Sequence, residues 1–167
     1  AETGVERWTA NLDRASGGNG FVSTPKVRDG VVVACTREFS TPFKGVIAGF
    51  DAATGRELWR YAWDPLPPFT NASCDRFVVI SRSLAMGSLD DGRIVALNLR
   101  SETVRWISPP IPGFNSTVDE RPLAVVDDTI LGAGSLSGFV TGIDVETGRQ
   151  LWRSAEARFG ETVINNG

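Results

Sequence analysis

The chain has 167 residues, which is room for one domain, since domains most often contain about 100 to 150 residues. Its 17 basic and 20 acidic residues leave a net charge of −3, so we expect no nucleic-acid partner. It contains no histidine, which excludes Ser-His and Cys-His nucleophiles and His-containing metal sites. The longest apolar run, Val31 to Cys35, has the length of a strand, so no membrane span is expected.

The first predicted element, residues 1–20, contains Thr3-Gly4 followed by Trp8. The same combination of a turn and a tryptophan recurs three times further along the chain, at a period of about 50 residues. Units of this length with several short strands are typical of β-propeller blades. Because the strand that precedes the turn is missing here, we expect residues 1–20 to be a partial blade.

The first complete unit covers about residues 21–63. Asp29-Gly30 between two apolar runs predicts a tight β-hairpin. Apolar residues then alternate up to Asp51, as in a strand with one buried face, and Thr54-Gly55 completes a turn. Trp59 starts the next strand. The unit therefore holds four strands.

The second and third units, about 69–108 and 118–154, repeat this plan. The turn has Asn98 in the second unit and Asp144 in the third. In each unit a small residue stands two positions before the Asp or Asn of the turn. We expect this small residue to let a neighbouring sheet approach closely. Residues 155–167 resemble the start of a further blade. The predicted fold is all-β, a β-propeller of four-stranded antiparallel blades with three complete blades and two partial ones.

Two sets of residues recur once per unit. Recurrence of this kind indicates a structural role, because the residues of a single active site would not be repeated in every unit. The large indole rings are expected to dock one unit on the next, and the Asp or Asn residues to cap the turns. These structural residues are Trp8, Trp59, Trp106, Trp152, Asp51, Asn98 and Asp144.

The motif Gly49-x-Asp51-x-x-Thr54-Gly55-x-x-x-Trp59 resembles the tryptophan-docking repeat of quinoprotein propellers, the pyrroloquinoline quinone (PQQ) repeat family. The resemblance covers most of the chain. The same repeat occurs in PQQ-dependent dehydrogenases, in the outer-membrane assembly lipoprotein propeller and in extracellular sensor domains. It therefore implies a periplasmic or cell-surface location and leaves the activity open between these classes.

Three blades cannot close a propeller, so we expect the partner to be another protein chain or the remaining propeller blades. We expect a non-catalytic segment that binds a protein or ligand, with no cofactor. The alternative that the resemblance implies is a fragment of a PQQ-dependent dehydrogenase, which would use PQQ with calcium. Contacts to a partner are expected in the connecting loops and at the blade rims. The candidate residues are Arg37, Phe39, Phe43, Lys44, Phe69, Arg82, Phe114 and Arg121.

Two cysteines, Cys35 and Cys74, lack the spacing of a redox or metal motif. Because cysteine is among the most frequently buried residues, we expect buried free thiols. A mutual disulfide is the alternative.

Overall fold

The computed structural model describes residues 4–12, 23–38, 42–65, 78–89, 92–111, 123–134 and 139–154. Within these ranges the regular structure consists entirely of strands. The strands are β1 (Lys26–Arg28), β2 (Val31–Glu38), β3 (Lys44–Asp51), β4 (Glu57–Trp63), β5 (Val78–Ser81), β6 (Leu84–Ser88), β7 (Ile94–Asn98), β8 (Val104–Ile107), β9 (Leu123–Val126), β10 (Thr129–Gly134), β11 (Phe139–Asp144) and β12 (Gln150–Arg153).

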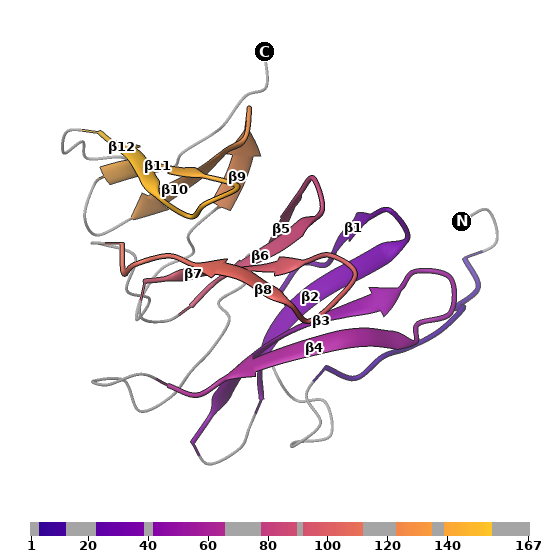
Figure 1. Ribbon diagram of the computed structural model, residues 1–167. Helices are drawn as coiled ribbons and strands as arrows, with labels where there is room; N and C mark the ends of the chain where they lie inside the picture. The colour runs from indigo at the N-terminus through magenta and orange to yellow at the C-terminus, as the bar shows by residue number, and fades with distance from the viewer. Residues whose placement is uncertain are drawn as a thin grey trace.

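The strands form three four-stranded sheets in which each strand pairs antiparallel with its neighbour in sequence (Figure 1). Their orders are β1-β2-β3-β4, β5-β6-β7-β8 and β9-β10-β11-β12. The predicted all-β class with four-stranded antiparallel blades is confirmed. We call these sheets blades 1, 2 and 3. The predicted partial blade at residues 155–167 lies outside the described residues, and residues 4–12 contain no strand.

The first hairpin of each blade turns through a positive backbone φ. In blade 1 the turn is Asp29-Gly30, with φ of 50° and 74°, and in blade 3 it is Asp127-Asp128, with φ of 44° and 62°. Two consecutive positive φ values match the right-handed twist of the flanking strands, and Asp and Gly tolerate them better than most residues.

Each blade also carries one register shift, at the same place in the motif. In blade 1 the pairing of β3 with β4 shifts between Gly49 and Phe50, and the corresponding shifts follow Ala96 in blade 2 and Gly142 in blade 3. A shift of this kind bends the strand and increases its local twist. The outer strand of every blade is thus bent immediately before its tryptophan.

The hydrophobic core lies in layers between the sheets. Val33, Ile47 and Trp59 of blade 1 pack with Ala85 and Val95 of blade 2. A second cluster joins the opposite face of blade 2 to blade 3, and a third lies between blade 1 and the segment before it. The first strands, β1, β5 and β9, contact one another in succession. This side-by-side arrangement is expected of the inner strands of a propeller.

Candidate functional site

The turn that the motif predicts is built around its aspartate. In blade 1 the Oδ1 atom of Asp51 accepts hydrogen bonds from the backbone N–H of Ala53 (3.1 Å) and of Thr54 (2.8 Å), and from the Thr54 hydroxyl (2.8 Å). In blade 3 Asp144 accepts from the backbone and hydroxyl of Thr147 at 2.8 and 2.6 Å. The threonine hydroxyl is the largest cause that lowers the pKa of each carboxyl group below its usual value. Both carboxylates therefore stay ionised at neutral pH and hold their turns.

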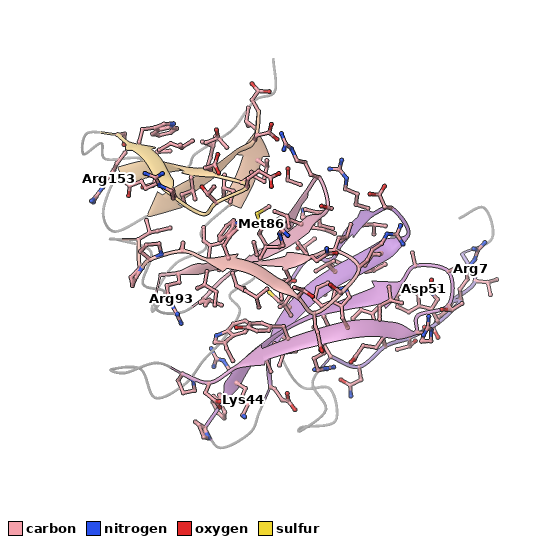
Figure 2. All side chains as sticks on the ribbon, viewed as in Figure 1. Arg7, Lys44, Asp51, Met86, Arg93 and Arg153 are labelled. Carbon is pink, nitrogen blue, oxygen red and sulfur yellow. The ribbon has the colours of Figure 1, made fainter. Side chains whose placement is uncertain are left out.

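Both turns of a blade lie at the same end of its sheet, which we call the turn end. The backbone N–H of Ala52 donates to the carbonyl of Gly30 (2.8 Å), and that of Val145 donates to the carbonyl of Asp128 (3.0 Å). The connection from β2 to β3 lies at the other end, which we call the loop end. Figure 2 shows Lys44, Arg93 and Arg153, one from each blade, along one side of the molecule and Asp51 on the opposite side.

Three indole rings reach from one unit to the turn of the next. The Nε1 atom of Trp8 donates to the carbonyl of Ala52 (3.1 Å), that of Trp59 to Leu99 (2.8 Å) and that of Trp106 to Val145 (2.9 Å). In every case the acceptor is the residue that follows the Asp or Asn of the turn. One geometry is thus used three times along the chain.

Glycines leave the space that these rings occupy. A Cβ atom on Gly49 would collide with the indole of Trp59, and one on Gly142 with the indole of Trp152. The sequence predicted that the small residue at this position admits a neighbouring sheet. The ring of the adjacent strand in the same blade fills the space instead, because cross-strand partners point to the same face of a sheet.

The fourth indole lies at an open face. Trp152 is 45% exposed and Leu151 is 55% exposed, whereas Trp59, at the equivalent place in blade 1, is 4% exposed. Leu58, the counterpart of Leu151, packs against the core between blades 1 and 2. Blade 3 therefore presents to solvent the same face that blades 1 and 2 bury against a neighbour.

Arg82, a predicted rim contact, lies at the turn end between blades 2 and 3. Its guanidinium group donates to both carboxylate oxygens of Asp128, with Nε at 2.9 Å, and to Glu146 at 2.8 Å. The hydrogen bonds to these two carboxylates raise the pKa of Arg82. Its side chain thus links two blades.

Three other predicted contacts lie together at the loop end of blade 1. The guanidinium carbon of Arg37 lies 5.7 Å from the centroid of the Phe43 ring, within range of a cation–π contact. Lys44 forms an exposed ion pair with Asp64 (3.1 Å). Phe39, Phe69, Phe114 and Arg121, the remaining predicted contacts, lie outside the described residues.

Sequence reasoning missed two aromatic residues beside this group. Trp63 lies over Gly45 as Trp59 lies over Gly49, four residues away on each strand. Tyr61 stacks with Trp63 at a centroid distance of 6.1 Å and an interplanar angle of 26°. A second Gly and Trp pair in the same hairpin register, four residues further from the turn on each strand, was the signal that could have revealed them. Strands β2, β3 and β4 are longer than their counterparts in blade 2, so this cluster lies on an extension of blade 1.

The expectation of a buried free thiol at Cys35 is wrong. Cys35 is completely buried, and it is disulfide-bonded. The only other cysteine in the sequence is Cys74, in the segment between β4 and β5 that lies outside the described residues. Burial alone does not distinguish a thiol from a half-cystine, because both are equally apolar.

Within the described ranges, no three His, Cys, Asp or Glu side chains gather closely enough to hold a metal ion. In the same part of the chain, no helix has the length and apolar character needed to cross a bilayer.

Comparison with known proteins identifies the repeat. A family model described as outer membrane protein assembly factor BamB, of the PQQ-repeat type, matches residues 1–109 and 90–167. The chain belongs to the PQQ-repeat β-propeller family. The resemblance noted from the motif is therefore confirmed.

The relatives include both alcohol dehydrogenases and outer membrane protein assembly factors. The chain is 31% identical to quinohemoprotein alcohol dehydrogenase ADH IIB of Pseudomonas putida, over 87% of this chain and 21% of the dehydrogenase. It is 26% identical to BamB of Nitrosomonas eutropha, over 87% of this chain and 35% of that protein. BamB of Moraxella catarrhalis superposes with a TM-score of 0.58 at 23% identity, over 82% of this chain and 38% of that one. The chain thus spans about a fifth to a third of its curated relatives.

Proposed function

We propose that the chain is part of an extracytoplasmic β-propeller that serves as a non-catalytic scaffold for binding another protein. The observation that carries the proposal is that the recurring acidic residues are engaged in holding the turns. Asp51 and Asp144 hold their own turns through several short hydrogen bonds, and their lowered pKa values make them poor proton acceptors at neutral pH. The acidic groups that the repeat supplies in blades 1 and 3 thus serve structure.

The open face of blade 3 supports a partner in the form of a further blade. It carries the indole of Trp152, whose three counterparts each donate to a carbonyl in the next turn. The turn of blade 1 in a second copy of the chain cannot receive Trp152, because Trp8 of that copy already occupies the space beside Gly55. The partner would therefore be a blade with an unoccupied turn of the same type.

The extracytoplasmic location is supported by two observations. Cys35 is disulfide-bonded, and structural disulfides persist in oxidising compartments. The family model and the relative from Nitrosomonas eutropha bear the name of an outer membrane protein assembly factor.

Site-specific photo-cross-linking in the native cell tests the scaffold role. A photoreactive residue at Lys44 samples the loop end of blade 1, and one at Leu151 samples the open face of blade 3. A matched control at Arg105 lies on an exposed part of the outer strand of blade 2. We expect one recurring protein adduct from Lys44 or Leu151 and none from Arg105. Equal adducts from all three positions would contradict a specific scaffold.

A fragment of a PQQ-dependent dehydrogenase is the second candidate. It is favoured by the 31% identity to a quinohemoprotein alcohol dehydrogenase, which exceeds the 26% identity to BamB. The chain would be incubated with PQQ and Ca²⁺, and reduction of an artificial dye would be followed with ethanol as the substrate. The scaffold proposal predicts no shift in the quinone absorbance and no dye reduction. Ethanol-dependent reduction would replace it with the dehydrogenase.

A further inference from the structure

The loop end of blade 1 brings a guanidinium group and an indole ring to one face of the sheet. Arg37 on β2 pairs with Gly45 on β3, and Gly45 pairs with Trp63 on β4. Cross-strand partners point to the same face, so Arg37 and Trp63 share it. The next row along this face is Cys35, Ile47 and Tyr61. Arg37, Tyr61 and Trp63 thus form one continuous patch.

One aromatic ring contacts the guanidinium group of this patch, and two further rings lie on the same face. Because Gly45 has no side chain, the ring of Trp63 lies directly over the middle strand. Tyr61 stacks on Trp63 (6.1 Å), and the Phe43 ring lies 5.7 Å from the guanidinium carbon of Arg37. All four side chains are half-buried. Neighbouring apolar surface reduces screening by water, which strengthens an electrostatic contact made there.

Among the described residues, Arg37 lacks the carboxylate partners that Arg60 and Arg82 have. Its Nε atom is buried and makes no hydrogen bond, and no carboxylate of the described ranges forms an ion pair with it. By contrast, Arg60 on the next strand but one bonds to Glu57 (3.0 Å) and to the carbonyl of Leu12 (2.9 Å). A partly buried cation without a counter-ion is unfavourable, and a bound anion would relieve the cost.

The indole N–H of Trp63 has no acceptor in the part of the chain that the structure describes, whereas that of Trp59 donates to a carbonyl at 2.8 Å. A guanidinium group and an indole N–H only donate hydrogen bonds. A site of this kind selects an anion over a sugar, whose hydroxyl groups would also need acceptors.

We propose that Arg37, Trp63, Tyr61 and Phe43 form a binding site for a carboxylate group, supplied by an acidic side chain of the protein partner. The planar guanidinium group matches a carboxylate through two parallel hydrogen bonds, and one positive charge balances one negative charge. The Phe43 ring holds the guanidinium group, and the rings of Tyr61 and Trp63 would pack against the apolar stem of the acidic side chain. The inference rests on the proposed scaffold function and names the chemistry of its partner.

Nuclear magnetic resonance of the indole N–H groups tests the site in the full chain. The Trp63 signal would be assigned with Trp63→Phe, and a blocked pentaglutamate peptide would be titrated at low salt. We expect the Trp63 signal to shift in a saturable way, with the Trp59 and Trp106 signals unchanged because those groups are already bonded. Blocked pentaglutamine, which lacks the charge, should cause no shift. Glutarate serves as a small carboxylate that is not part of a peptide.

Variants separate the site from general charge attraction. Arg37→Gln should weaken pentaglutamate binding about tenfold, as expected from the loss of a charged hydrogen bond. Arg37→Lys keeps the charge without the planar guanidinium group, so its affinity for pentaglutamate should lie between those of the wild type and Arg37→Gln. Arg105→Gln, at an exposed arginine of blade 2, should change the affinity less than twofold. The amide spectrum of each variant reports whether it is folded.

The outcomes are distinct. Absence of a Trp63 shift with both carboxylate probes, or equal weakening by Arg37→Gln and Arg105→Gln, would overturn the site. Glutarate binding as tightly as the peptide would support a carboxylate site but assign it to a small ligand. A negative result for the carboxylate site would not alter the cross-linking test of the scaffold function. Dye reduction with ethanol would refute the scaffold function whether or not the Trp63 signal shifts.

Discussion

The interface between blades 1 and 2 and the open face of blade 3 use the same motif with different results. Trp59 is 4% exposed and donates to Leu99, whereas Trp152 is 45% exposed. Each ring nevertheless lies over its own glycine, Gly49 or Gly142. The placement of the ring is thus a property of one blade. Its burial, and with it most of its contribution to stability, requires the neighbour.

The largest expected change in the free energy of unfolding follows removal of the buried indole ring. Trp59→Ala should lower the free energy of unfolding by about 3 to 5 kcal/mol, as a large aromatic deletion in a core does. Trp152→Ala should lower it by about 1 kcal/mol, because the exposed ring has fewer contacts to lose. Urea denaturation followed by circular dichroism measures both. Equal losses would mean that the open face of blade 3 is covered in solution.

The disulfide distinguishes the first blade from the third. Double substitution of Cys35 and Cys74 by alanine should cost about 2 to 5 kcal/mol, the usual loss for a native disulfide. The same urea transition, measured with and without a reducing agent, checks this result. Reductant should lower the midpoint of the wild type and leave the double variant unchanged. An unchanged wild-type midpoint would show that the bond adds nothing.

The turns provide a smaller effect that depends on pH. The pKa values of Asp51 and Asp144 are lowered in the folded chain, so the folded state favours their ionised forms. Their contribution is therefore fully present above the unfolded pKa of about 3.9 and is lost as the pH falls through the folded values. Asp51→Asn with Asp144→Asn should flatten the acid side of the stability profile, because blade 2 already carries Asn98 at this position. An unchanged acid slope would assign the pH dependence to other carboxylates.

The smallest effect is expected at the exposed ion pairs between blades 2 and 3. Arg82→Gln removes contacts to Asp128 and Glu146, and surface pairs of this kind are screened by salt. The melting temperature should fall slightly at low salt and match the wild type in 1 M NaCl. A salt-independent loss would indicate that Arg82 contributes by packing.

The amount that could be predicted differs between the fold and the candidate site. The turns, strands and alternation follow from residues close together in sequence, such as Asp51, Thr54 and Gly55, whose hydrogen bonds form within five residues. The patch at Arg37 depends on the register of three strands and on the length of β4. Arg37 and Arg82 have the same residue type, yet one lacks a carboxylate partner among the described residues and the other has two. Local pattern does not reveal which carboxylates of a neighbouring blade lie within reach of a given arginine.

The sequence by itself determined the blade: its four strands, its capped turns and the tryptophan near the start of the outer strand. It did so because each feature arises from short-range backbone and hydrogen-bond chemistry repeated three times. Only the tertiary structure decided which indoles are buried against a neighbouring blade and that Cys35 is disulfide-bonded rather than a free thiol. These outcomes depend on contacts between units that lie about 40 or more residues apart, as the hydrogen bond from Trp59 to Leu99 does.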